Sequence, residues 1–130
     1  MPQKQVAALP VRRSKAGALE VLLVTARSDG EWMIPKGARS PDISNAKAAA
    51  REALQEAGVK GRVRREPLGS YVHESDRRGT VKVVVYELVV EEQLKHWRER
   101  NVRKRKWASL AEAARMTTQI GLRAFLLDLC

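Results

Sequence analysis

The chain has 130 residues, of which 44% are hydrophobic, and its formal net charge is +10. This length suits one domain, residues 1–130, and excludes a second, while no apolar run is long enough to cross a membrane or to form a secretion signal. The single cysteine, Cys130, excludes an internal disulfide, and we expect a cytoplasmic protein without a membrane partner.

The first part of the chain predicts strands. Residues 5–13 suggest a strand in which Pro10 indicates an edge position or a bulge. Residues 19–26 are a nearly continuous run of branched apolar side chains, typical of a buried strand. Residues 32–34 predict a short extended segment that leads into the Pro-Lys-Gly loop at 35–37.

An alanine-rich helix is predicted over residues 46–57. Asp42 or Ser44 can cap its N-terminus, and Gly58 stands in the usual C-terminal position. One face carries small side chains that can sit close to a sheet, with Glu52, Gln55 and Glu56 on the other. The alanines of that face are Ala46, Ala49, Ala50, Ala53 and Ala57.

Two longer strands follow, at residues 61–74 and 80–90, with a turn at 75–79. Val81, Val83 and Val85 alternate with their neighbours and predict an aliphatic face toward a core.

The end of the chain predicts two helices. Ser109 to Glu112 is a capping box that opens a helix toward Arg115. Thr118 can cap a last helix with four inward-facing residues. These are Ile120, Ala124, Phe125 and Leu127. Helices that flank a mixed sheet in one chain predict an α/β sandwich.

Residues 95–106, which we call the basic segment, concentrate positive charge: six lysines and arginines precede Lys106 against Glu99 alone. Such a field attracts polyanions. A solvated loop that keeps the protein soluble is the simpler alternative.

Glu52 and Glu56 are one helical turn apart and share a face, which is entered from the loop that holds Lys36 and Gly37. Two carboxylates placed in this way can hold a hard divalent cation that also meets phosphate. The pattern indicates metal-assisted hydrolysis of a phosphoanhydride. The alternative is an exposed helix whose glutamates form surface ion pairs.

The segment 37–59 resembles the Nudix box: Gly, five residues, Glu, seven residues, Arg-Glu, an apolar residue, any residue, Glu-Glu, any residue, Gly and an apolar residue. The matching positions are Gly37, Arg51, Glu52, Glu56, Gly58 and Val59, with a weak fit at Ala53. Ile43 and Gln55 stand where the pattern has glutamates. The resemblance implies a Nudix-type α/β/α sandwich with a mixed β-sheet.

Within that superfamily the chain looks most like diphosphoinositol polyphosphate phosphohydrolases. The residues that carry this likeness outside the box are Ala7-Ala8, Val21 to Val24, Arg27, Trp32, Val59 to Gly61 and Arg103 to Trp107. The resemblance implies cleavage of a diphosphate on a crowded polyphosphate, with Mg²⁺ or Mn²⁺ as cofactor.

The same resemblance implies roles for particular residues. Glu52 and Glu56 would bind the metal, Gln55 would occupy the place of a third ligand, and Arg51 would orient a glutamate. The backbone at Lys36 and Gly37 would line the phosphate path. The candidates for gripping the polyanion are Arg12, Arg27, Arg103 and Arg105. Glu74 and Glu99 are the acids available as a general base.

Several alternatives stay open from the sequence. The same chemistry could act on nucleoside or dinucleoside polyphosphates, or on the 5′ end of RNA. A binding protein could have kept the fold and lost the chemistry through Gln55 and Ile43, where Asp42 could substitute or Ile43 could simply pack. The chain could be a monomer or a homodimer.

Overall fold

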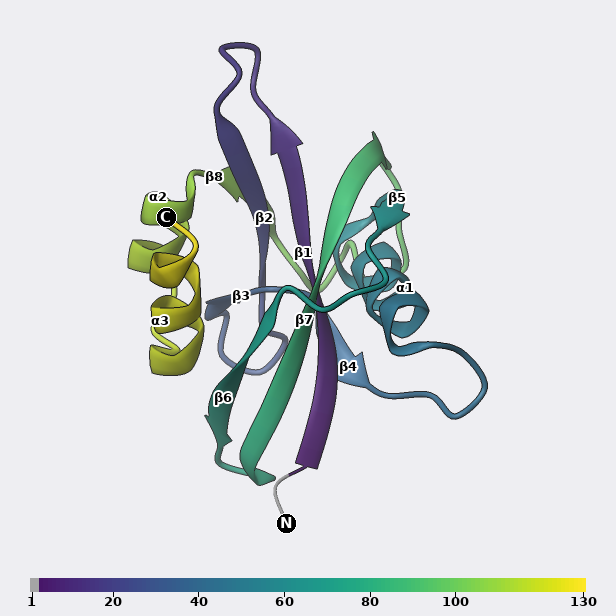
Figure 1. Cartoon of the computed structure of the whole chain (residues 1–130), viewed down its shortest axis with the longest axis vertical. Coiled ribbons are helices and arrows are strands. Elements are labelled where there is room, and N and C mark those ends of the chain that lie inside the picture. The colour runs from purple at the N-terminus through teal and green to yellow at the C-terminus, as the bar shows by residue number, and fades with distance from the viewer. Residues whose placement is uncertain (1–2) are drawn as a thin grey trace.

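A mixed β-sheet organises the chain, which the structure, a computed structural model, describes over residues 3–130 (Figure 1). Within these residues eight strands form the sheet, and its main path runs β3-β2-β1-β7-β5. In addition, β4 pairs with β1, β6 with β7 and β8 with β2. The bounds are β1 (Gln3–Arg13), β2 (Leu19–Thr25), β3 (Trp32–Met33), β4 (Lys36–Ala38), β5 (Val59–Val63), β6 (Gly69–Ser75), β7 (Gly79–Gln93) and β8 (Arg105–Ala108).

Pro10 lies in an interior strand, so the predicted edge position or bulge is wrong. β1 lies between β2 and β7, and it runs parallel to β7 in unbroken register, with Pro10 level with Leu88. On its other side β1 pairs with β4 as far as Ala7 and with β2 only from Val11 onward. Pro10 falls between these two pairings, where no neighbour on that side needs an amide donor.

The strand predicted over residues 61–74 is two strands. β5 ends at Val63 and β6 begins at Gly69, and the residues 64–68 between them are exposed and include Pro67. Pro67 has no amide hydrogen to donate to a strand ladder, and the chain changes direction here. Both strands pair with the 15-residue β7: β6 with its first part and β5 with its last.

Helices cover both faces of the sheet, which confirms the α/β sandwich with a mixed sheet. α1 (Asn45–Ala57) packs on β1 and β5, whereas α2 (Leu110–Met116) packs on β2 and α3 (Ile120–Asp128) on β6. Figure 1 shows α1 on one side of the sheet and α2 with α3 on the other. The predicted start of α2 at Ser109 is confirmed, because the Ser109 side chain accepts a hydrogen bond of 3.1 Å from the Glu112 amide.

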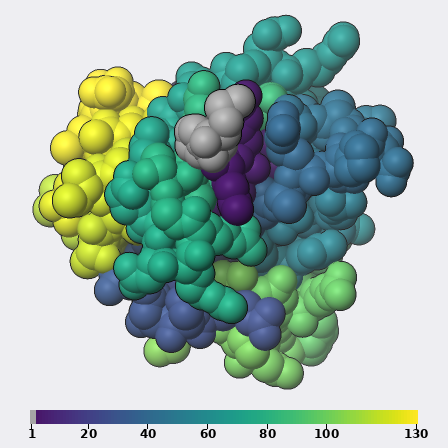
Figure 2. All heavy atoms as spheres, turned by 90° about the horizontal axis from the view of Figure 1, so that it is seen from below, coloured from purple at the N-terminus to yellow at the C-terminus, as the bar shows by residue number. Residues whose placement is uncertain are grey.

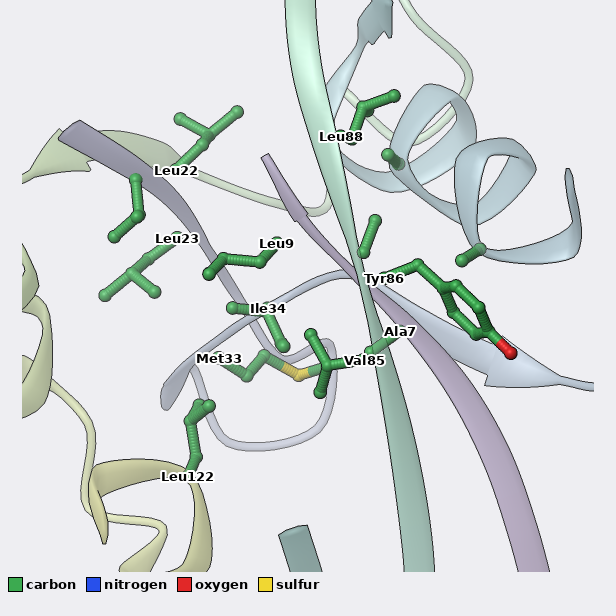
Figure 3. Packing of buried hydrophobic residues seen from close by; sticks show 14 of the residues in the cluster. Ala7, Leu9, Leu22, Leu23, Met33, Ile34, Val85, Tyr86, Leu88 and Leu122 are labelled. Carbon is green, nitrogen blue, oxygen red and sulfur yellow. The ribbon is translucent and has the colours of Figure 1, made fainter. Parts of the chain in front are cut away.

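Aliphatic side chains fill both sides of the sheet (Figure 3). Met33, Ile34 and Val85 lie on the side that faces Leu122 of α3, and all four are buried. Leu88 and Tyr86 point toward α1, where the buried alanines of that helix allow close packing. The core therefore fixes α1 and α3 on opposite faces of the same strands.

The predicted inward face of the last helix is wrong at Ile120, Ala124 and Leu127, and it is confirmed at Phe125. Leu122, Phe125 and Leu126 are buried, whereas Ile120 is 82% exposed, Leu127 is 53% exposed and Ala124 is also exposed. Thr118 is not the cap, since Gln119 holds that position without a side-chain bond. The phase of the helix follows from Gly121, where an added Cβ would overlap the Val72 carbonyl oxygen of β6. This close approach turns Ile120 outward.

Candidate metal and phosphate site

Glu52 and Glu56 both lie on α1, as the sequence predicted. The Ser44 side chain caps the helix by accepting a hydrogen bond of 3.2 Å from the Lys47 amide, and Gly58 ends it in the left-handed conformation at a φ of 67°. Glu52 is half-buried and Glu56 is buried at 4% exposure. Glu56 therefore faces the strands and not the solvent.

The start of β4 meets these carboxylates. The Lys36 amide donates to Glu56 Oε1 over 3.3 Å. Gly37 lies against Glu52, because a Cβ built at Gly37 would overlap the Glu52 carboxylate. A glycine is required at this position by the close approach, and the predicted meeting of the Lys-Gly segment with the glutamate pair is what the structure shows.

Glu56 has an unusual environment for a carboxylate. Burial, and in smaller part the charge of Glu52, raise the pKa of Glu56 to about 8, although Arg103 and the Lys36 amide act in the opposite direction. A buried carboxyl that keeps its proton beside a second carboxylate is a group that a divalent cation would relieve, since the cation favours the ionised form of both.

The donor set fits a magnesium-like ion. Glu52 and Glu56 offer carboxylate oxygens, and the half-buried Gln55 offers an amide oxygen. Across residues 3–130 no group of three or more His, Cys, Asp or Glu side chains is placed to hold a metal ion. Mg²⁺ keeps several waters and is commonly bound through one or two carboxylates together with substrate phosphates, so two glutamates suffice.

The side chain of Lys36 lies close enough to Glu56 for their charges to interact. Its ammonium donates to Gln5 Oε1 over 2.8 Å, and burial lowers its pKa, with further lowering by Arg78 and Arg103 and an opposing effect of Glu56. A lysine held in this position presents a cation next to the site where phosphate would meet the metal.

Arg103 connects the basic segment to Glu56. Its Nη2 lies 3.8 Å from Glu56 Oε1, its Nε donates to Glu99 Oε1 over 2.8 Å and its Nη1 donates to the Thr25 carbonyl. The side chain is only 9% exposed. The sequence analysis did not identify Glu99 as the partner of Arg103, although their spacing of four residues was an available signal, because one turn of chain brings such side chains together.

Arg105 and Trp97 hold the C-terminal end of α1. Arg105 donates to the carbonyls of Ala57 and Leu94, and its guanidinium lies 3.9 Å from the centroid of the Trp97 ring. Trp97 Nε1 in turn donates to the Glu56 carbonyl over 3.0 Å. Both side chains therefore contact the backbone of the turn that presents Glu56.

The other predicted contacts are spread over the molecule. Arg51 lies 3.9 Å from Glu52 Oε2 and is exposed. Arg27 lines a hollow of about 400 Å³ together with Arg100, Arg103 and Lys104. Arg12 pairs with Glu20 over 2.9 Å and lies over the Trp107 ring. The structure does not bring Arg12 to the carboxylates, because it lies five residues beyond Ala7, the residue level with Lys36, or about 17 Å along the strand.

The positions that depart from the box have simple surroundings. Ile43 is half-buried and packs against the core, whereas the neighbouring Asp42 is exposed.

Glu74, one of the two acids considered as a base, accepts a hydrogen bond from Thr80 Oγ1 on the adjacent strand. The other, Glu99, is held by Arg103.

A mixed sheet between helices, with a glutamate pair facing a Lys-Gly strand, defines a Nudix-type domain. The family model described as the NUDIX domain matches residues 1–129, and the chain belongs to this family. Nudix hydrolases generally use a divalent metal, typically Mg²⁺, and Nudix domains as a family bind nucleotide-like polyphosphates.

The chain is similar to curated and solved members of the family. It is 39% identical to Nudix hydrolase 21, chloroplastic, of Arabidopsis thaliana over 83% of this chain and 56% of that protein. It is 38% identical to the human diphosphoinositol polyphosphate phosphohydrolase NUDT4B over 75% of this chain and 54% of that protein. The chain thus spans about half the length of these relatives.

The fold is shared with a solved Ap4A hydrolase of C. elegans in a binary complex, with a TM-score of 0.76 and 22% identity over 98% of this chain and 94% of that one. In the part of the chain that the structure describes, no helix is long and apolar enough to span a membrane.

Proposed function

We propose that this chain hydrolyses a phosphoanhydride bond in a polyphosphate substrate with a divalent metal, Mg²⁺ or Mn²⁺, held by Glu52 and Glu56. The observation that carries the proposal is the buried Glu56 carboxyl, which faces Glu52 and accepts from the Lys36 amide. Family membership supports the reaction type.

In this proposal each residue of the site has a separate role in binding the metal or in positioning a metal ligand. A bound divalent cation supplies polarisation of a phosphoryl oxygen and acidification of a water molecule. Glu52 and Glu56 hold it, with Gln55 as an additional oxygen donor. The Lys36 amide and Arg103 fix the orientation of the Glu56 carboxylate. Gly37 leaves room for the chain to approach Glu52.

The substrate contacts follow from charge and position. The Lys36 ammonium and the backbone at Gly37 lie beside the carboxylates and would line the phosphate path. Arg27 borders the hollow that Arg103 also lines, and can reach a phosphate there. Arg12 and Arg105 remain predictions as substrate contacts, since their guanidinium groups already have protein partners. The general base remains a choice between Glu74 and Glu99.

The substrate class has two candidates. The similarity to the human diphosphoinositol polyphosphate phosphohydrolase favours a diphosphoinositol polyphosphate, the class that the sequence resemblance implies. A nucleoside or dinucleoside polyphosphate, or the 5′ end of RNA, uses the same chemistry. A domain that binds such ligands without cleaving them, with Gln55 as the altered position, is the alternative to an enzyme. A cytoplasmic location and a monomeric or homodimeric state remain predictions.

The test of the reaction is phosphate release from a panel of diphosphates with Mg²⁺ or Mn²⁺. We expect activity that EDTA abolishes and that Glu56→Gln lowers by about 1,000-fold, because loss of a charged metal ligand removes several kcal/mol of stabilisation. Glu91→Gln, on the exposed part of β7, is the matched control and should keep full activity. Equal background rates in the wild type and Glu56→Gln would leave only a binding function.

A further inference from the structure

Gln5 is a buried polar residue of β1 that has no role in the site as described so far. Its side chain is 7% exposed, and the strand residues that follow it, Val6 to Leu9, are aliphatic and buried. A buried amide costs free energy unless its polar atoms have partners. Gln5 Oε1 accepts from the Lys36 ammonium over 2.8 Å. The partner of this buried glutamine is therefore the cation beside the carboxylate pair.

The register of the sheet places Gln5 and Lys36 on the same face. Ala7 lies opposite Lys36 of β4 and opposite Val85 of β7, and side chains of opposed residues share a face. Gln5 precedes Ala7 by two residues and so points to the same side, which is the side of α3 (Figure 3). Figure 2 shows the start of β1 in purple between the teal segment that contains β6 and the blue segment of residues near 40.

The two donors of Lys36 go to different acceptors. Its amide donates to Glu56 Oε1 over 3.3 Å, whereas its ammonium donates to Gln5, although the charge of Glu56 acts on it. Within residues 3–130 the one cation that pairs with Glu56 is Arg103, at 3.8 Å. The four-carbon stem of a lysine is flexible, and without an acceptor at Gln5 the ammonium would turn to the nearby carboxylate. Gln5 thus keeps this cation off Glu56.

The neutrality of the Gln5 amide has a second consequence. An uncharged acceptor fixes the ammonium and leaves its positive charge in place, whereas a carboxylate at the same position would cancel that charge. Lys36 is half-buried, so its charge can still be reached from outside the sheet. The hydrogen bond to Gln5 therefore holds Lys36 without removing what attracts a phosphate.

We propose that Gln5 is a positioning residue of the site. Its amide oxygen holds the Lys36 ammonium away from Glu56, which leaves the carboxylate free for the divalent cation and the ammonium free for a phosphate of the substrate. This inference rests on the proposed function, because it uses the roles given there to Glu56 and Lys36. It adds to the site a residue that lies outside segment 37–59 and that touches neither metal nor substrate.

Two substitutions of Gln5 separate holding the ammonium from leaving it charged. Gln5→Leu removes the acceptor and fills the buried position with an apolar side chain of similar size, so the ammonium is released toward Glu56. Gln5→Glu keeps an acceptor oxygen in the same place and cancels the charge of Lys36. Gln3→Leu and Gln3→Glu are the matched controls, since Gln3 is an exposed glutamine two residues earlier on the same strand.

The first measurement is a calorimetric titration with Mn²⁺ in the absence of substrate. We expect Gln5→Leu to weaken Mn²⁺ binding about tenfold, because the ammonium competes with the metal for Glu56. Gln3→Leu should leave the affinity unchanged. In a Lys36→Met background, which has no ammonium, Gln5→Leu should also have no effect. An equal loss of affinity in both backgrounds, or no loss in either, would overturn the inference.

The second measurement is the steady-state kinetics of phosphate release from the diphosphate of the panel that the wild type cleaves best. We expect Gln5→Glu to raise KM about tenfold with little change in kcat, because the cancelled charge weakens contact with phosphate in the ground state and the transition state alike. Gln3→Glu adds the same charge at the surface and should match the wild type. Because Gln5→Glu keeps the buried hydrogen bond, an unchanged KM would overturn the inference even if Gln5→Leu fails to fold.

Failure of the proposed function would look different from failure of this inference. Mn²⁺ binding that Glu56→Gln leaves unchanged would reject Glu56 as a metal ligand, whatever the Gln5 variants do. Mn²⁺ binding that depends on Glu56 but is the same in Gln5→Leu and Gln3→Leu would keep the metal site and reject only the role of Gln5.

Discussion

Residues 37–59 and the basic segment meet at the C-terminal end of α1, and they differ in how well their charges could be interpreted from the sequence. The spacing of Gly37, Glu52 and Glu56 predicted a meeting of loop and carboxylates that the structure contains. In the basic segment, Arg103 and Arg105 are directed at protein groups, including Glu99 and the Ala57 carbonyl.

The difference shows that a charge counted in a sequence is not necessarily a charge offered to a ligand. Arg98, Arg100 and Lys104 of the basic segment are exposed and can attract a polyanion, whereas Arg103 and Arg105 hold α1 in place. The segment therefore combines a solvent-exposed field with an internal support for the carboxylates, and substitutions can separate these two contributions.

The largest effect is expected for Arg103→Gln compared with Arg98→Gln. Loss of Arg103 leaves the Glu99 carboxylate without its cation in a region of low exposure and removes the hydrogen bond to the Thr25 carbonyl, and we expect a loss of about 3 kcal/mol in the free energy of unfolding. Arg98→Gln removes the same charge from the surface and should cost less than about 0.5 kcal/mol. Urea unfolding measures both, and similar values would mean that the two arginines play the same role.

A pH effect should follow from Glu56 in the metal-free protein. The pKa of this carboxyl is raised from 4.5 to about 8 in the folded state, so its contribution to stability is present below pH 4.5 and is lost as the pH rises through 8. We expect a loss on the order of 2 kcal/mol across this window, after allowance for relaxation of the site.

The measurement is unfolding in EDTA from pH 5 to 9. Glu56→Gln has no such proton to lose and should lack this component of the pH profile. Mg²⁺ competes with the proton, and its stabilising effect on the wild type should be greater at pH 8 than at pH 6. A wild-type profile identical to that of Glu56→Gln would show that the carboxyl is ionised throughout.

Gln55→Glu tests whether the altered box position still lies within reach of the metal. An additional carboxylate on this face should tighten Mn²⁺ binding about tenfold, or about 1.4 kcal/mol. Lys47→Gln lowers the net charge by the same amount at the exposed start of α1 and is the control. Equal Mn²⁺ affinities for these two variants in a calorimetric titration would place Gln55 outside the site.

The smallest effect is expected for Trp97→Phe. This change keeps an aromatic ring under Arg105 and removes the hydrogen bond to the Glu56 carbonyl, and should cost about 1 kcal/mol in stability. Trp107→Phe removes an exposed hydrogen bond to Gln93 and should cost less. A larger thermal shift for Trp107→Phe would contradict a supporting role of Trp97 at the helix end.

The fold and the carboxylate pair could be predicted because they depend on local signals. Ser44 and Gly58 mark the ends of α1 through capping and a left-handed residue, and these choices need no knowledge of distant contacts. The facing of α3 could not be predicted in this way. Residues 120–129 are apolar on nearly every side, so periodicity alone allows more than one buried face.

A groove of about 700 Å³ between the β2–β3 connection, β6 and the start of α3 was also not predicted from the sequence, for a related reason. Asp29, Val72 and Gln119 are far apart in the sequence and carry no shared spacing, and the contact of Gly121 with the Val72 carbonyl brings α3 against β6. A glycine in the first turn of an apolar helix was the available signal, since it permits an approach that any side chain would block. Which strand it approaches is a property of the assembled sheet.

The long strand β7 has a consequence for how members of this family can diverge. Its first part pairs with β6, on which α3 packs, and its last part pairs with β5, which directly follows the helix that bears the glutamates. Substitutions along the first part can therefore alter β6 and α3 while the support of the glutamate-bearing helix is preserved. A single continuous strand thus lets these two regions of the domain change separately.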